Sequence, residues 1–188
     1  MIRVGILALQ GAFIEHRNML EGLGIECFEI RKPIDLEREM DGLILPGGES
    51  TVMGKLLRDL RMFDGIRNMV LNGLPVLGTC AGAILMADDV IDGPSHLATV
   101  PMTIRRNAYG RQLGSFNTIS EFAGKAGVPM TFIRAPIIES VGEDVDILAS
   151  VDGVPVAVRY GDQVAMTFHP ELSDDTTIHS YFVDIMKG

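Results

Sequence analysis

The chain has 188 residues, of which 47% are hydrophobic and 22% are charged, and its formal net charge is −9 at pH 7. This size and composition predict a single compact domain over residues 1–188. The negative charge disfavours a nucleic-acid partner, because phosphate binding needs clustered lysine and arginine. The sequence shows neither a membrane-spanning apolar run nor a secretion-signal pattern, so we expect a cytoplasmic protein whose two cysteines are reduced.

The first half of the chain alternates strand and helix patterns. Helical spacing predicts a short helical turn over 35–40 and Gly73 as a helix C-cap. Repeated strand–helix–strand units imply a parallel sheet covered by helices on both faces. The strands are predicted over 3–9, 25–30, 42–45 and 74–78, and the helices over 12–23, 51–60 and 62–72.

The second half reads as partly antiparallel. Asp152-Gly153 and Gly161-Asp162 are typical two-residue hairpin turns. A final amphipathic helix is predicted over 174–186, with Ser173 or Asp174 as its N-cap. Strands are predicted over 102–105, 130–134, 146–151, 154–160 and 163–168. We therefore expect a doubly wound α/β fold with three layers, whose mostly parallel sheet gains antiparallel hairpins in its C-terminal half.

Cys80 is the first candidate for a catalytic residue. It lies in Gly78-Thr79-Cys80-Ala81-Gly82, directly after a predicted strand and before a helical pattern over 83–87. A strand that runs through G-x-C-x-G into a helix is typical of a nucleophile elbow, with a thiol in place of serine. The glycines permit a sharp turn, and the helix N-terminus favours the thiolate. The alternative is a buried structural cysteine, for which two flanking glycines have no use.

His169-Pro170-Glu171 supplies the other two groups that a cysteine nucleophile needs, a base and an orienting group. Residues i and i+2 of an extended chain point the same way, and Pro170 pushes His169 toward an extended conformation. We therefore expect Glu171 to orient His169 while His169 faces Cys80. Taken alone, such a histidine is more often a turn residue after a strand, and the elbow at Cys80 reverses that preference.

The remaining histidines and the second cysteine show no such pattern. His16 shares a predicted helix face with leucines and reads as packing or surface, His96 lies in a loop, and His179 lies in the last helix. We interpret Cys27, in an apolar strand pattern, as core packing. The spacing of histidine and cysteine does not indicate a metal site, and we expect neither a metal nor a cofactor.

A glycine loop supplies candidate oxyanion donors. Residues 46–50, Pro-Gly-Gly-Glu-Ser, follow a predicted strand and offer bare backbone N–H groups, among which we expect Gly48 to donate. The N–H of Ala81 is a second donor, because it follows the nucleophile. The glycine pair is alternatively a phosphate loop or a plain turn, but it lacks the spacing and the lysine of a P-loop.

Arg105-Arg106 and Arg134 are cations near predicted strand ends. A guanidinium binds a substrate carboxylate well, and the alternative for each is surface solvation. Ligands of open α/β sheets bind outside the carboxyl ends of the strands. Four of the singled-out stretches fall at such ends, so we expect them to face one cleft: residues 10–11, 46–50, 78–82 and 169–171.

Together these stretches resemble the class I (triad) glutamine amidotransferase family and, more closely, the glutaminase subunits of pyridoxal 5′-phosphate synthase. The elbow and the His-Pro-Glu tripeptide mark the wider family, whereas LQGA, PGGEST and FIRAP mark the closer group. A histidine often follows FIRAP in that pattern, and Ile137 stands there in this chain. The matching stretches run in order over nearly the whole chain: 5–12, 41–51, 78–82, 106–112, 132–136 and 168–172.

The resemblance implies a function and a set of site residues. It implies that Cys80, His169 and Glu171 form a triad that hydrolyses L-glutamine, and that Gln10 and Gly11 lie at the interface with a synthase subunit. That partner would be a barrel enzyme that uses the ammonia to build pyridoxal phosphate from a pentose phosphate and a triose phosphate. The residues implied to hold glutamine are Gly47, Gly48, Glu49, Arg106, Ile133 and Arg134.

Three other functions remain open from the sequence. The same triad serves glutaminases of other synthases, such as that of imidazole glycerol phosphate. A cysteine peptidase or a stress-response protein of similar fold would act on peptides or aldehydes and ignore glutamine. A regulatory subunit that retains the fold without activity is the third, and the intact Cys-His-Glu set argues against it.

Overall fold

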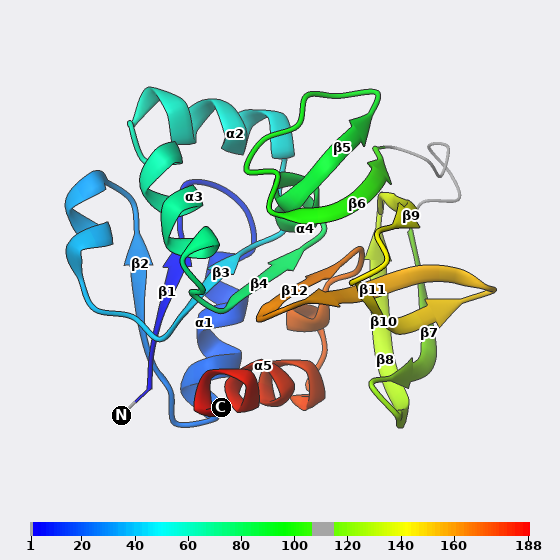
Figure 1. Cartoon of the computed structure of the whole chain (residues 1–188). Helices are drawn as coiled ribbons and strands as arrows, with labels where there is room; N and C mark the ends of the chain where they lie inside the picture. The colour runs from blue at the N-terminus through cyan, green and yellow to red at the C-terminus, as the bar shows by residue number, and fades with distance from the viewer. Residues whose placement is uncertain (1, 107–114) are drawn as a thin grey trace.

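The computed structural model describes residues 2–106 and 115–188 of the chain. A seven-stranded sheet runs through the middle of the molecule, in the order β10-β11-β12-β4-β3-β1-β2 (Figure 1). The pairs β2–β1, β1–β3, β3–β4 and β4–β12 are parallel, while β12–β11 and β11–β10 are antiparallel. The strands are β1 (Arg3–Leu7), β2 (Glu26–Ile30), β3 (Gly42–Leu45), β4 (Val76–Thr79), β10 (Asp146–Val151), β11 (Val154–Tyr160) and β12 (Gln163–Met166).

Helices cover both faces of this sheet, so the molecule has three layers. One face packs against α2 (Ser50–Asp59), α3 (Phe63–Leu71) and α4 (Ala81–Met86), whose buried side chains share one core cluster. The opposite face packs against α1 (Phe13–Gly22) and α5 (Thr177–Lys187), which contribute to a second cluster. The doubly wound arrangement predicted from the strand–helix alternation is therefore present.

Two smaller sheets and two short 3-10 helices complete the fold. The strands β5 (Ala87–Ile91), β6 (Val100–Arg105) and β9 (Ile137–Val141) extend the first core cluster. The hairpin of β7 (Ser115–Phe122) and β8 (Lys125–Ile133) packs its inner face against the second. The 3-10 helices are η1 (Pro33–Glu37), after β2, and η2 (Pro170–Leu172), after β12. Within the described residues, no helix is long and apolar enough to cross a membrane.

The final helix begins later than the sequence indicated. It starts at Thr177 instead of residue 174, so the N-cap expected at Ser173 or Asp174 is wrong. The Ser173 hydroxyl instead donates to the Pro170 carbonyl and accepts from the N–H of Asp175. The Asp175 carboxylate in turn accepts from the N–H of Thr177. These local hydrogen bonds continue the turn that begins at η2 and delay the helix.

Three strands were missed, and several boundaries were shifted. β5 follows α4 without a break, and its two exposed aspartates hide the strand pattern. β7 alternates exposed and half-buried residues, and β9 begins at Ile137, the residue that departs from the family pattern. Elsewhere, β1 ends at Leu7 instead of residue 9, β4 begins at residue 76 instead of 74, and β8 begins five residues before the predicted start.

Candidate active site

The carboxyl ends of four parallel strands meet in one cleft of about 380 Å³. Residues that follow β1, β3, β4 and β12 line it, as the sequence predicted from the position of the motifs. Two of the predicted site residues, Ala81 and Glu171, do not reach its surface and lie buried behind it. The predicted residues that line the cleft are Gln10, Gly11, Gly47, Gly48, Glu49, Cys80, Arg106, Ile133, Arg134 and His169.

Cys80 sits on a strained turn between β4 and α4. Its φ of 48° and ψ of −101° are unfavourable for a residue with a side chain, as expected at a nucleophile elbow. The N–H of Cys80 donates to the Met166 carbonyl of β12, and its carbonyl accepts from the N–H of Ile84 in α4. The residue is thus fixed from both sides, with its side chain at the N-terminus of the helix.

The glycines around Cys80 are required by close packing. A Cβ at Gly82 would overlap the carbonyl oxygen of Leu45 at the end of β3. A Cβ at Gly78 would overlap the sulfur of Met86 and lie 2.9 Å from the Gly82 carbonyl carbon. Side chains at these two positions would therefore clash, which explains why the sharp turn predicted at Cys80 has a glycine on either side.

His169 lies beside Cys80, and Glu171 lies behind it. The glycine at position 47 leaves room for both: a Cβ there would overlap the His169 ring and lie 3.5 Å from the Cβ of Cys80. His169 Nδ1 is 2.7 Å from Glu171 Oε1, which is buried. Burial alone would lower the pKa of His169, but the hydrogen bonds and charges of Cys80 and Glu171 outweigh it and raise the pKa to about 10. This pKa favours a protonated imidazole beside Cys80.

The backbone that joins His169 to Glu171 differs from the extended dipeptide assumed from the sequence. His169 has a φ of −113° and a ψ of 86°, and Pro170 starts the 3-10 helix η2. The N–H of His169 donates to the Thr131 carbonyl of β8. Glu171 reaches the imidazole because the helical turn folds back. The expected contact is present, but the i, i+2 alternation of an extended chain is the wrong reason for it.

The glycine loop after β3 is held by residues that follow β1. The Gly47 carbonyl accepts from the N–H of Ala12, and the Gln10 side-chain oxygen accepts from the N–H of Glu49. The carbonyl of Gly47 and the N–H of Gly48 belong to one peptide and point in opposite directions. The hydrogen bond from Ala12 therefore fixes the direction in which the candidate oxyanion donor of Gly48 points.

We expect Gly11→Ala to reduce glutamine hydrolysis at least tenfold. Gly11 has a φ of 95°, and an added Cβ would overlap the Gly47 carbonyl oxygen, so the peptide that carries the Gly48 N–H must turn or move. Losing one oxyanion donor typically costs 10²–10³ in kcat. Steady-state kinetics measure the loss, and Gly124→Ala is the control: its φ of 81° imposes similar strain, but nothing lies within 4 Å. Equal activity of the two variants would contradict the expected role of the contact.

The two candidate arginines have different surroundings. Arg106 Nη2 lies 3.1 Å from Glu49 Oε1, and that carboxylate also caps α2 by accepting from the N–H groups of Thr51 and Val52. Burial acts to raise the pKa of Glu49, but these N–H groups and Arg106 lower it overall. In the described part of the chain no ion pair involves Arg134, which lines the cleft with a φ of 44°.

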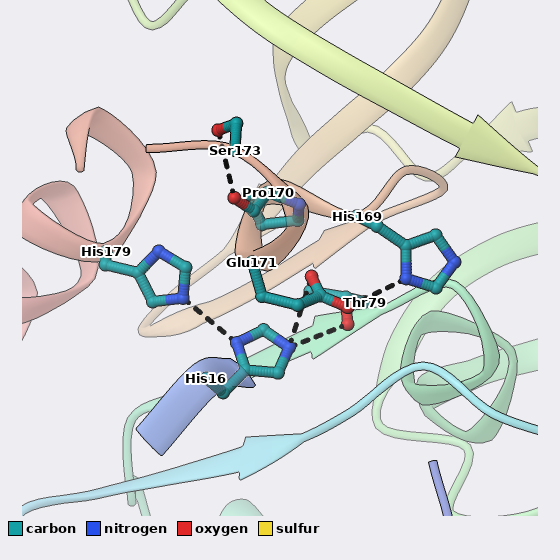
Figure 2. Close-up of polar contacts among 7 residues, drawn as sticks. All are labelled: His16, Thr79, His169, Pro170, Glu171, Ser173 and His179. Atoms are coloured by element: carbon teal, nitrogen blue, oxygen red, sulfur yellow. Dashed lines mark hydrogen bonds and ion pairs between the residues drawn. The ribbon is translucent and has the colours of Figure 1, made fainter. Parts of the chain in front are cut away.

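Two histidines that the sequence did not single out for function lie behind the candidate triad. His16 of α1 and His179 of α5 are both fully buried, and His16 faces the Glu171 carboxylate (Figure 2). The sequence left His16 as packing or surface and placed His179 in the last helix, and it gave no sign of the contact. His96 is also buried, lies 3.2 Å from Arg58 and does not line the cleft.

Cys27 matches its interpretation as packing. It is a free, buried cysteine within the second core cluster, and burial raises the pKa of its thiol to about 11. Across residues 2–106 and 115–188, His, Cys, Asp and Glu side chains form no cluster suited to a metal ion. The part of the 106–112 stretch beyond Arg106 lies outside the described residues.

A family model described as the SNO glutamine amidotransferase family matches residues 6–187. The chain belongs to this family. The protein named pyridoxal 5′-phosphate synthase subunit PdxT of Desulfitobacterium hafniense (strain DSM 10664 / DCB-2) is 56% identical over 100% of this chain and 94% of its own length. The protein of the same name from Methanocorpusculum labreanum is 56% identical over 100% of this chain and 99% of its own.

Solved structures of glutamine amidotransferases share the fold. A crystal structure described as a glutamine amidotransferase has a TM-score of 0.93 at 43% identity and covers 98% of this chain and 99% of its own. The structure of PurLQS from Thermotoga maritima has a TM-score of 0.65 at 15% identity, which shows the fold alone. The fold class predicted from the sequence is confirmed, and so is the resemblance to the amidotransferase family.

Proposed function

We propose that this chain is the glutaminase subunit of a pyridoxal 5′-phosphate synthase. It hydrolyses L-glutamine to L-glutamate and ammonia, and the ammonia passes to a separate barrel-type synthase subunit. The observation that carries the proposal is the Cys80–His169–Glu171 arrangement at the end of a family-typical elbow. The full-length relatives at 56% identity carry the name of that synthase, which supports the choice of partner over other synthases.

The first half of the reaction forms a thioester. The Cys80 thiolate attacks the side-chain amide carbon of glutamine, and the Gly48 and Ala81 N–H groups stabilise the oxyanion. His169, protonated in the resting site, gives its proton to the nitrogen as the carbon–nitrogen bond breaks and ammonia leaves. The protein is then acylated on sulfur, and His169 is neutral.

The second half restores the site. Neutral His169 takes a proton from water, and the resulting hydroxide attacks the thioester carbon. The carbon–sulfur bond breaks and Cys80 returns as the thiolate beside the protonated imidazole. The new carboxyl group releases the second proton of the water to solvent, and glutamate leaves. Glu171 keeps the imidazole oriented and compensates its charge throughout. In each turnover His169 gives one proton to the departing ammonia and takes one back from water.

The cleft offers recognition for the rest of the substrate. Arg134 or Arg106 binds the α-carboxylate of glutamine, and Glu49, an anion held by Arg106 and the N-terminus of α2, binds the α-amino group. Gly47, Gly48 and Ile133 supply the surrounding wall. We assign Gln10 and Gly11 to the edge that meets the synthase subunit.

Exposed apolar side chains around the cleft support a docking partner. Ile133 and Leu172 line the opening and are 41% and 45% exposed. Ile14 is 54% exposed at the start of α1, two residues after the lining residue Ala12. Apolar groups of this kind favour a protein partner over solvent, and docking there closes the cleft over bound glutamine.

The deciding experiment measures ammonia release from glutamine by the chain, alone and with the synthase subunit of a pyridoxal 5′-phosphate synthase. We expect stimulation by the synthase and loss of the activity in Cys80→Ala, because no other group replaces the thiolate. Cys27→Ala is the matched control and should retain activity, since that thiol lies in the core. No release from wild type with the synthase, while Cys80 is still alkylated, would refute the proposal and favour a peptidase or stress-protein activity.

A further inference from the structure

A chain of buried polar side chains continues behind Glu171 and ends in the last helix (Figure 2). Glu171 Oε1 meets His169, whereas Oε2 lies 3.4 Å from Nε2 of His16. The same His16 nitrogen is 3.1 Å from the Thr79 hydroxyl, one residue before Cys80. On the other side of the ring, His16 Nδ1 is 3.0 Å from Nε2 of His179. The chain therefore joins α1, β4, η2 and α5 directly beneath the elbow.

The contacts determine which nitrogens carry protons. A lone pair on His16 Nε2 would face the lone pairs of the Glu171 carboxylate, so that nitrogen holds the hydrogen, and its hydrogen-bond acceptor is the Thr79 hydroxyl oxygen. His16 Nδ1 then accepts, which requires His179 Nε2 to donate. His179 Nδ1 is left without a proton, and it is the ring nitrogen that lacks a hydrogen-bond partner among the described residues. All donors in the chain thus point toward Glu171.

The neutral state of both rings fits this direction. Burial lowers the pKa of His16 and lowers that of His179 to about 3. Charged groups facing His16 are Glu171 of η2, Glu15 of its own helix and, beyond the carboxylate, His169. The two glutamates act against burial, and His169 acts with it. Glu171 therefore lies between one protonated imidazole, that of His169, and one neutral imidazole, that of His16, whose Nε2 is 3.4 Å from it.

We propose that His16 is a positioning residue for the triad: its Nε2–H faces the second oxygen of Glu171 and restricts the rotation of that carboxylate, and the His16 ring is itself fixed by the Nε2–H of His179. The inference rests on the proposed function, because its effect is measured on glutamine hydrolysis. Its physical reason is that Oε2 is buried, has no hydrogen bond from any described residue, and lies 3.4 Å from the Nε2 of His16. A carboxylate held at one oxygen alone can rotate about its carbon–carbon bond, and the imidazole that it orients moves with it.

His16→Leu and His16→Gln form the matched pair of variants. Leucine fills the space without a donor, whereas the glutamine amide places an N–H close to the position of His16 Nε2. We expect His16→Leu to lower kcat about ten- to a hundred-fold with little change in KM, as is typical when an outer partner of a functional histidine is lost. Its acid limb in the pH profile of kcat should move toward neutral pH, since Glu171 loses the polar neighbour that lowers the pKa of its carboxyl group. His16→Gln should recover most of the rate.

Each measurement uses the chain with its stimulating synthase subunit, beside thermal unfolding of each variant. His179→Leu is the second variant and should show a smaller loss of kcat in the same direction, because it acts through His16. Unchanged kcat and pH profile in folded His16→Leu would overturn the inference, as would an equal loss in His16→Gln or a change confined to KM. Absence of glutaminase activity in wild type would instead refute the proposed function, so the two failures are distinguishable.

Discussion

Replacing Glu171 with Gln is expected to lower kcat for glutamine by about 10³–10⁴-fold, in line with the loss seen when an amide replaces the orienting carboxylate of a catalytic triad. The amide keeps the size of the side chain but removes the charge that helps to hold the pKa of His169 at about 10. The amide also places an N–H donor opposite Nδ1 of His169. In the protonated imidazole that nitrogen carries a hydrogen too, so two donors face each other. The imidazole then loses both its orientation and its stabilised proton.

The pH profile of kcat/KM distinguishes this effect from a general loss of structure. With the carboxylate removed, the pKa of His169 falls, so its proton is lost at lower pH and the alkaline limb moves toward neutral. Glu143→Gln makes the same change of charge at an exposed turn and should leave the rate and profile unchanged. Wild-type kcat in Glu171→Gln would exclude Glu171 from the triad.

The second large effect is on stability, and we expect it for Gly82→Ala. The added methyl group would overlap the main-chain carbonyl of Leu45, which no side-chain rotation relieves. Overpacking against fixed backbone costs about 3 kcal/mol of the free energy of unfolding. For a chain of this length, such a loss lowers the melting temperature by about 6–12 °C. Activity should fall as well, since the shift of α4 moves the Ala81 N–H.

Gly22→Ala provides the opposite result from the same substitution. Gly22 is the exposed last residue of α1, and a Cβ there has nothing within 4 Å. Alanine removes conformational freedom from the unfolded chain and should raise the free energy of unfolding by about 0.5–1 kcal/mol. Calorimetry on both variants checks the pair. A Gly82→Ala variant as stable as wild type would show that the elbow tolerates a side chain.

The elements that position the cleft were predictable because their signals are local. The apolar runs of β1, β3 and β4 are buried on both faces, and each ends at a glycine-rich stretch that turns the chain. The elbow around Cys80 follows from steric limits on the two glycines, which the packing of Gly82 against Leu45 bears out. Periodicity and glycine placement were sufficient for these parts.

Other parts depend on contacts that no local pattern encodes. His16 and His179 lie 163 positions apart, and neither helix carries a sign that the two rings meet. β5 consists of Ala87–Ile91, whose exposed aspartates resemble a loop until β6 pairs beside them. The approach of Glu171 to His169 depends on a 3-10 turn that Pro170 begins, whereas an extended segment was expected.

The pairing of β4 with β12 also determines when the central sheet of this protein can be completed during synthesis. β4 is complete by residue 79, but its neighbour β12 emerges only after residue 163. Until then β4 is an apolar strand with one open edge, the kind of surface that promotes aggregation. Long-range pairing of this kind is slow to form. A nascent chain therefore exposes Cys80 well before its proposed partner His169 exists, and the candidate active site can assemble only after the last strand of the sheet is in place.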